Sequence, residues 1–229
     1  MNSKKVLIHL GYPKVGSTSL QTFLDKIRDK NFTFFSTKFR EGPYCNYLNK
    51  TFLEIEKQIF FEENDNLKKD WIKYFEINLN HINVISNELF LYPINYRFVN
   101  FQRTLKRYLD ILTYLDCEIE LLIMIRDPKE LHISFFTDMY HRFIQYDNSL
   151  ISFKEYILSI EKNKVTKHIF ETFNFNKIIC LVEEIDDRLL INKNFHILRL
   201  EKINDFKNFF FNFCKNFNLK NEFNYLNIQ

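Results

Sequence analysis

One stretch of the sequence decides the fold: His9-Leu10-Gly11-Tyr12-Pro13-Lys14-Val15-Gly16-Ser17-Thr18-Ser19-Leu20-Gln21. It holds two of the chain's 3 glycines, Gly11 and Gly16. Residues 6–10, which lead into the loop of residues 11–16, are mostly apolar and β-prone, and residues 17–28, which follow the loop, carry apolar side chains at helical spacing. A strand, a glycine loop and a helix N-terminus in this order predict a site for a phosphate-like anion, because free backbone N–H groups and the helix dipole point at the ligand.

The glycine loop differs from the nucleoside-triphosphate loop G-x-x-x-x-G-K-[ST] in the position of its lysine. Gly11 and Gly16 have the spacing of that motif, and Ser17 supplies a hydroxyl. No lysine follows Gly16, and the lysine of the loop is Lys14 instead. This change argues against ordinary ATP chemistry with Mg²⁺. It favours a loop whose lysine contacts the bound anion from the side opposite to that of the lysine in the nucleoside-triphosphate motif.

Strand and helix patterns alternate along the rest of the chain. The expected strands are residues 5–10, 32–37, 82–86, 118–125 and 195–201, and the expected helices are residues 17–30, 51–79 with a break at 62–66, 97–115, 128–145, 152–173 and 205–218. Residues 177–190 fit either a strand or a helix. The alternation predicts an α/β fold with a central parallel sheet and helices on both faces, a P-loop-like three-layer sandwich, in one domain that spans residues 1–229.

The composition of the chain indicates which partners, compartment and cofactors to expect. Charged residues make up 27% of the chain and the net charge is only +3, so we expect no nucleic-acid partner, for which a concentrated basic patch is needed. The first apolar run stops at Gly11, short of the ~7–15 residues of a signal peptide, and no run approaches the ~18 apolar residues of a membrane helix. We therefore expect a cytoplasmic protein. Cysteines and histidines lack metal-ligand spacing, so no metal is expected.

A second motif stands at the end of the most apolar expected strand. Arg126-Asp127-Pro128 follows residues 118–125, and Ser134 lies eight residues after Arg126 on the next helix. Open α/β sheets bind ligands at the carboxyl ends of their strands, so Arg126 should lie at the same edge as Lys14. The planar fork of arginine suits phosphate. Taken singly, Arg126 also fits a surface ion pair, and Ser134 fits a solvated helix serine.

Taken together, Pro13-Lys14-Val15-Gly16-Ser17-Thr18 and the pair Arg126 and Ser134 resemble the sulfotransferases that use 3′-phosphoadenosine 5′-phosphosulfate (PAPS). The resemblance implies PAPS as donor, 3′-phosphoadenosine 5′-phosphate (PAP) as product, and a hydroxyl or amine acceptor. The Arg-Lys-Gly stretch of the cytosolic animal members is missing, which points to the bacterial or glycan-modifying branches and to a carbohydrate acceptor. The implied donor-binding residues are Lys14, Val15, Gly16, Ser17, Thr18, Ser19, Arg126 and Ser134.

The resemblance also implies roles in catalysis. Lys14 would stabilise charge on the leaving phosphate and the transferring sulfuryl oxygens. Glu88 is the first candidate for the general base, because Ser86-Asn87-Glu88 follows an expected strand and resembles a Ser-Ser-Glu segment of bacterial-type members. His9, at the end of the first strand, is the second candidate. Glu88 also fits a structural carboxylate, and His9 also fits a buried, hydrogen-bonded strand histidine.

Two other functions share the strand, loop and helix. A P-loop kinase acting on a small molecule would need a lysine after Gly16 and a carboxylate for Mg²⁺. A non-catalytic nucleotide-binding protein of the same fold would bind PAP without transferring a group.

Overall fold

The computed structural model describes residues 4–26, 32–36, 54–55, 58–59, 68–87, 101–146, 150–160, 162–183, 194–199, 208 and 212. Its centre is a five-stranded parallel sheet with the order β2-β3-β1-β4-β5. The strands are β1 Lys4–Leu10, β2 Phe32–Ser36, β3 Ile82–Asn87, β4 Cys117–Ile125 and β5 Asn194–Arg199. The predicted parallel sheet is therefore confirmed.

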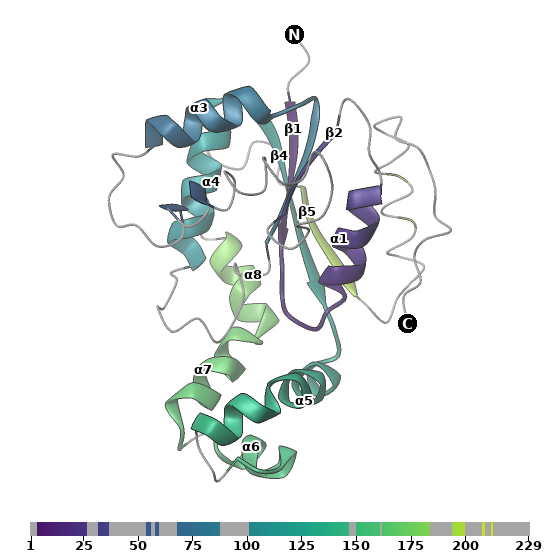
Figure 1. Cartoon of the computed structure of the whole chain (residues 1–229), viewed down its shortest axis with the longest axis vertical. Coiled ribbons are helices and arrows are strands. Elements are labelled where there is room, and N and C mark those ends of the chain that lie inside the picture. Colours follow the sequence, from purple (N-terminus) through teal and green to yellow (C-terminus); the bar gives the residue numbers. More distant parts are fainter. Residues whose placement is uncertain are drawn as a thin grey trace.

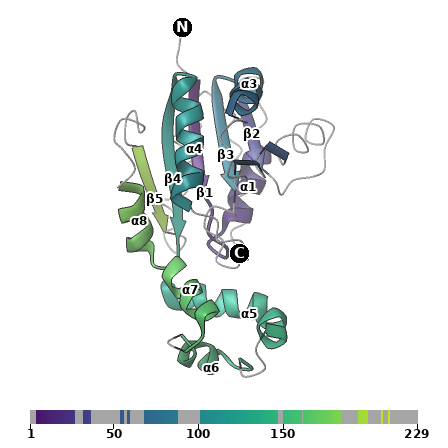
Figure 2. The same cartoon turned by 90° about the vertical axis from the view of Figure 1, so that its left-hand side faces the viewer.

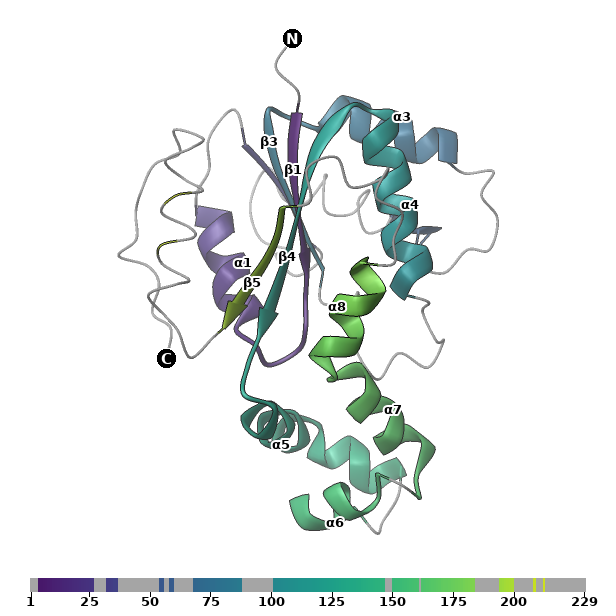
Figure 3. The ribbon, with the colours of Figure 1, turned by 180° about the vertical axis from the view of Figure 1, so that it is seen from behind.

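The helices are α1 Ser17–Lys26, α3 Lys68–Asn78, α4 Phe101–Tyr114, α5 Pro128–Tyr146, α6 Phe153–Leu158, α7 Lys164–Thr172 and α8 Phe175–Glu183. Helix α1 covers one face of the sheet, and α4 and α8 cover the other (Figures 1 and 3). Helices α5, α6 and α7 lie beyond the carboxyl edge of the sheet (Figure 2). Helices on both faces were predicted and are confirmed, and the α5–α7 group adds a wall next to the strand ends. None of the helices described is long and apolar enough to cross a membrane.

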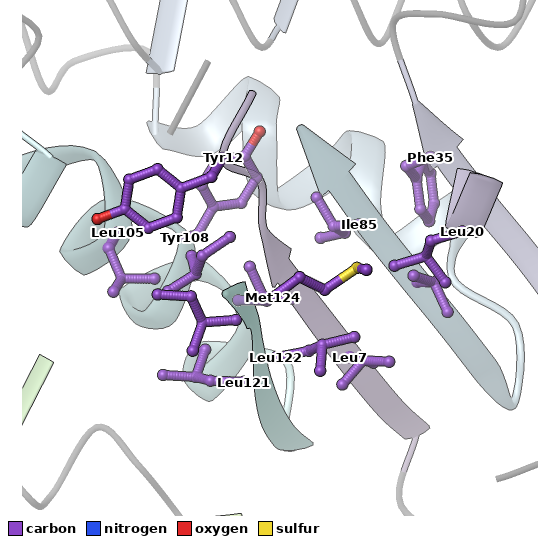
Figure 4. Packing of buried hydrophobic residues seen from close by; sticks show 14 of the residues in the cluster. Leu7, Tyr12, Leu20, Phe35, Ile85, Leu105, Tyr108, Leu121, Leu122 and Met124 are labelled. Atoms are coloured by element: carbon purple, nitrogen blue, oxygen red, sulfur yellow. The ribbon is translucent and has the colours of Figure 1, made fainter. Parts of the chain in front are cut away.

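The central strand β1 is held by packing on both faces. Its residues 6–10 are buried, as central strands of parallel sheets are. Leu7, Leu122 and Met124 from the central strands and Leu105 and Tyr108 from α4 belong to one cluster of buried side chains (Figure 4). Each fully buried aliphatic side chain contributes about 1.5–3 kcal/mol by leaving water. The strand that carries the glycine loop is therefore firmly fixed.

Strand register places the two sequence motifs at one edge. Leu10, the last residue of β1, lies opposite Asn87 of β3 and Ile123 of β4. Strand β4 continues to Ile125, so Arg126 follows slightly beyond the end of β1. The loop after β1 and Arg126 after β4 therefore leave neighbouring strands at the same edge, as the topology of open α/β sheets requires.

One predicted helix is wrong in its extent. Residues 152–173 form two helices, α6 and α7, with a break between them. Side chains compete for the backbone there: the Ser159 hydroxyl donates to the Tyr156 carbonyl, and the buried Thr166 hydroxyl contacts the Ser159 and Asn163 carbonyls. These local bonds replace the continuous helical ladder, a choice that periodicity alone does not reveal.

Other boundaries differ less. Residues 175–183 form helix α8, so the helical interpretation of the ambiguous segment is right for the residues described. Of the helix expected over 51–79, the structure describes helical residues at 54–55 and 58–59 and α3 at 68–78. The closing helix expected over 205–218 lies outside the described residues except for positions 208 and 212, which are helical.

Candidate active site

The loop after β1 has a left-handed backbone at two positions. Gly16 has φ 86° and Lys14 has φ 63°, an uncommon value for a residue with a Cβ atom. Helix α1 begins directly after the loop, where the Leu20 N–H donates to the Gly16 carbonyl at 3.1 Å. The Ser17 hydroxyl donates to the Tyr12 carbonyl at 2.9 Å and so closes the loop on itself. The N-terminus of a helix is a position where backbone N–H groups bind anions, and the loop leads directly into the N-terminus of α1.

Tyr12 anchors this loop to the helices beyond the sheet. Its hydroxyl donates to the Thr172 carbonyl at 2.6 Å, at the end of α7. Its ring packs on Phe173 and Phe175, with centroids 5.9 and 5.1 Å away. Burial raises the pKa of the Tyr12 phenol, so the side chain stays neutral and serves as an apolar anchor with one hydrogen bond.

Arg126 contacts the loop directly. Its Nη1 atom donates to the Lys14 carbonyl at 3.2 Å, and its Nη2 atom lies 3.9 Å from Glu130 of α5. The turn after Arg126 is fixed because the Asp127 carboxylate accepts from the N–H groups of residues 129 and 130, and Pro128 occupies the first helical position. Capping of α5 thus holds Arg126 at the mouth of the loop.

Helix α5 presents one polar stripe to the loop. Glu130, Ser134 and Asp138 recur at four-residue spacing and so share a helix face. Arg126 contacts the first of them, and the Lys14 Nζ atom lies 2.7 Å from the Asp138 Oδ1 atom. Ser134, half-buried, stands between these two ion pairs. Lys14 and Arg126, predicted from two distant motifs, therefore both contact α5 beside the loop, on the helix face that carries Ser134.

Both ion pairs involve exposed carboxylates. Asp138 and Glu130 expose 50% and 54% of their side chains. Exposed ion pairs contribute about 0–1 kcal/mol, so a multiply charged anion can displace either carboxylate at little cost. Lys14, Arg126 and the N-terminus of α1 therefore give the loop three positively charged or positively polarised groups that an anion can meet.

A buried polar network lies under the loop. The His9 Nδ1 atom is 2.8 Å from the Ser86 hydroxyl of β3, which also accepts from the Gln21 amide of α1 at 3.0 Å. Burial lowers the pKa of His9 to about 3, so its ring is neutral. The structure shows no hydrogen-bond partner for His9 Nε2 or Gln21 Oε1 among the described residues. Sequence reasoning did not include Gln21, although its position one turn after Ser17 places a polar side chain on the face of α1 that packs on the sheet.

The remaining predicted residues are distributed as follows. Val15 and Ser17 are buried, Ser19 is half-buried and Thr18 is exposed at the start of α1. Glu88, the first candidate for the base, lies outside the described residues and follows β3 directly in the sequence. Among the described residues, no group of three or more His, Cys, Asp or Glu side chains is arranged to hold a metal ion.

No family model matches the chain, and no curated protein matches it significantly. Among solved structures, the crystal structure of a sulfotransferase from Alicyclobacillus acidocaldarius superposes with a TM-score of 0.51 at 15% sequence identity, covering 96% of this chain and 83% of that one. At that identity the likeness shows a shared fold. A component of the PezAT toxin-antitoxin system of Streptococcus pneumoniae aligns over 79% of this chain and 66% of its own, with 10% identity and a TM-score of 0.34, too low to support an argument.

Proposed function

We propose that the protein is a sulfotransferase that moves a sulfuryl group from PAPS to an acceptor hydroxyl or amine. One observation carries the proposal: Arg126 donates to the Lys14 carbonyl, so the two sequence motifs meet at the N-terminus of α1. The shared fold with a solved sulfotransferase supports it. The expected compartment is the cytoplasm, and the first acceptor class to test is a carbohydrate.

In this proposal, the charge and position of each residue of the site determine which part of PAPS it binds. Lys14, with the N–H groups of residues 16–19 and the hydroxyl of Thr18, would hold the 5′-phosphosulfate. Ser17 would contribute its backbone N–H group, because its hydroxyl donates to the Tyr12 carbonyl. Arg126 and Ser134 would hold the 3′-phosphate through charge-assisted hydrogen bonds. PAPS supplies a neutral SO₃ unit, and its transfer in line depends mainly on positioning and on charge stabilisation at the leaving phosphate.

The acceptor needs a group that takes its proton. Glu88 remains the first candidate, since it directly follows β3 in the sequence and β3 ends at the edge where the loop lies. For His9, Nε2 is the nitrogen that would have to take the proton, because Nδ1 is engaged by Ser86. A neutral, buried His9 therefore fits a role in supporting the loop from below at least as well as a role as the general base. The variant Glu88→Gln distinguishes the two candidates. Loss of turnover with unchanged PAP binding would assign the general base to Glu88.

Ligand selectivity tests the proposal most directly. In a thermal-shift assay, PAP should stabilise the protein, whereas equal concentrations of ATP or ADP with Mg²⁺ should not, because bound ligand stabilises by RT ln(1 + [L]/Kd). Lys14→Ala should lower turnover of radiolabelled sulfate by about 10²–10³-fold. Arg126→Ala should weaken PAP binding by about 10–100-fold, as expected for lost charge-assisted hydrogen bonds.

The controls are Arg142→Ala, on an exposed position of α5, and Lys167→Ala, on an exposed position of α7. Both should keep wild-type binding and turnover. Selective stabilisation by ATP with Mg²⁺ would favour the kinase alternative instead. Tight PAP binding without transfer to any acceptor in a broad screen would favour a non-catalytic nucleotide-binding protein.

A further inference from the structure

Three buried polar side chains from different elements meet beneath the anion loop: His9 of β1, Ser86 of β3 and Gln21 of α1. His9 and Ser86 lie opposite each other in the register of the two parallel strands, and Gln21 stands one turn after Ser17 on α1. At most 1% of the surface of any of the three is exposed. Bulk water therefore does not compete for these bonds, and the donors and acceptors of the cluster determine their direction.

Ser86 lies at the centre of this cluster, and its hydroxyl has one proton to donate. The Gln21 Nε2 atom donates to the Ser86 oxygen at 3.0 Å, and the His9 Nδ1 atom lies 2.8 Å from the same oxygen. Among the described residues, the Ser86 hydroxyl makes no further hydrogen bond. Its proton therefore has one acceptor in this part of the chain, the Nδ1 atom of His9.

This order of donors determines the tautomer of His9. Nδ1 accepts from Ser86 only with its lone pair free, so the single proton of the neutral ring lies on Nε2. The ring is neutral near pH 7 because burial lowers the pKa of His9 to about 3. Nε2 therefore presents an N–H group, and this atom has no hydrogen-bond partner among the described residues.

The opposite order of donors is the competing arrangement. It turns the Gln21 amide over, so that Oε1 accepts from Ser86 and the Ser86 oxygen accepts from an Nδ1–H group of His9. The turned amide would place an NH₂ group, with two donors, where the unpartnered Oε1 atom now lies. Orphaned buried N–H donors are rarer in proteins than under-satisfied carbonyl oxygens. The order from Gln21 through Ser86 to His9 is therefore the favoured one.

The tautomer decides what His9 is able to do in a reaction. A general base needs a lone pair on the atom that takes the proton. Nδ1 of His9 already accepts from the Ser86 hydroxyl, and Nε2 already carries a hydrogen. His9 therefore cannot take the proton of an acceptor hydroxyl unless Ser86 and Gln21 both reorient.

We propose that Gln21 is a positioning residue that acts on His9 through Ser86 and holds the ring proton on Nε2. The tautomer is a property of the chain alone, whereas its consequence for catalysis rests on the proposed function. In that reaction His9 is a fixed N–H donor beneath the loop. The proton of the acceptor then passes to a base other than His9, and Glu88 is the first candidate.

Nuclear magnetic resonance of the full chain, labelled with nitrogen-15 in its histidines and without ligand, measures the tautomer. Correlations between ring protons and ring nitrogens distinguish a protonated from an unprotonated nitrogen, and wild-type His9 should show the Nε2–H tautomer alone. Gln21→Met keeps a side chain of similar length without the amide. Ser86 is then able to donate to Nδ1 or to accept from it, so both tautomers should appear.

The matched control is Thr22→Val, the next residue of α1, which loses a hydroxyl bonded to the Thr18 carbonyl. It should keep His9 in the wild-type tautomer. Ser86→Ala removes the intermediate hydroxyl and gives the same test if Gln21→Met does not fold. An Nδ1–H tautomer in the wild type would overturn the proposal. A His9 ring that keeps only the Nε2–H tautomer in Gln21→Met or Ser86→Ala would also overturn it, because the cluster would then not set the tautomer.

Turnover separates this inference from the proposed function. His9→Gln keeps an N–H donor and cannot act as a base, so it should lower turnover by about two- to tenfold, well short of the ~10²–10⁴-fold that a general base contributes. A loss of that larger size with unchanged PAP affinity would make His9 the base and sink the inference. If the chain shows the Nε2–H tautomer but neither binds PAP nor transfers sulfate, the tautomer assignment stands and the proposed function falls.

Discussion

The ammonium group of Lys14 lies 2.7 Å from the carboxylate of Asp138, so the cation of the anion loop is neutralised by helix α5. Asp138 shares its helix face with Ser134 and Glu130, and Glu130 in turn lies 3.9 Å from Arg126. Lys14 and Arg126 are thus each paired with an exposed carboxylate of α5.

Replacing that carboxylate should strengthen anion binding. Asp138→Asn removes the competing charge from Lys14 and removes repulsion of the incoming phosphate, and we expect PAP to bind about two- to tenfold more tightly. Isothermal titration at low and at physiological salt measures the change, which should shrink as salt rises. Asp70→Asn on α3, an exposed acidic position far from the loop in sequence, is the matched control and should leave the Kd unchanged. Weaker PAP binding in Asp138→Asn would mean that Asp138 holds Lys14 in place for the ligand.

Two substitutions of Lys14 test the energetic cost of its left-handed backbone separately from the loss of its charge. Lys14→Gly and Lys14→Ala both delete the ammonium, so both should lose most PAP affinity. Only glycine relieves the cost of φ 63° for a residue with a Cβ atom, which is about 1–2 kcal/mol. We therefore expect the free energy of unfolding of Lys14→Gly to exceed that of Lys14→Ala by about 1 kcal/mol in urea titrations. Equal stabilities would show that the loop backbone relaxes when the lysine is removed.

Tyr12 provides a test of the anchor between the loop and the helices. Tyr12→Phe keeps the ring against Phe173 and Phe175 and removes the hydrogen bond to the Thr172 carbonyl, so it should lower stability by about 1 kcal/mol without changing PAP affinity. Tyr12→Ala also empties a buried site and should cost about 3–5 kcal/mol. Urea unfolding and PAP titration measure both effects. If Tyr12→Phe loses PAP binding while remaining folded, the hydroxyl has a role in the site itself.

Two buried histidines predict acid sensitivity. The pKa of His9 is lowered to about 3 and that of His132 to about 4, both from 6.5 by burial. The unfolded chain therefore binds more protons below pH 6.5, and stability that is fully present above pH 6.5 is lost as the pH falls toward 4. Each shift corresponds to several kcal/mol at most, since one pKa unit is about 1.4 kcal/mol.

His132→Gln should reduce this loss by about 2–3 kcal/mol when the free energy of unfolding is compared at pH 7 and pH 4.5. The exposed His141→Gln serves as the control, and it should leave the slope of stability against pH unchanged. An unchanged slope in His132→Gln would show that His132 is able to reach solvent when it is protonated.

Much of the fold follows from the sequence because its determinants are local. Glycine spacing before an amphipathic run predicts the loop and α1, and the apolar run of residues 121–125 predicts a strand buried on both faces. Arg126 was placed at the loop because parallel strands end at a common edge. The break between α6 and α7 was missed because it depends on hydrogen bonds of Ser159 and Thr166 that compete with the helix.

The parts of the site that sequence did not reveal depend on contacts between distant segments. In the sequence, Asp138 is one of several charged residues of an expected helix. Its ion pair with Lys14 is found only when α5 is placed beside the loop. In the sequence, Gln21 is simply a polar residue of the expected helix. Its hydrogen bond to Ser86, which also contacts His9, is found only in the folded structure. The cavity of about 610 Å³ between α5, α6 and the α7–α8 junction lies between successive helices, and periodicity does not show how these helices pack.

The pairing of β1 has a consequence for how the chain is made. Its two neighbours in the sheet, β3 and β4, are both translated later, and β4 is complete only at Ile125. At about 5–20 residues per second, β1 waits roughly 6–20 s on the ribosome for its second neighbour, with apolar side chains and unpaired backbone groups exposed. The loop that is synthesised first is therefore assembled late. We expect nascent chains truncated before residue 117 to be dependent on chaperones, and those extended past α5 to be the first that bind PAP.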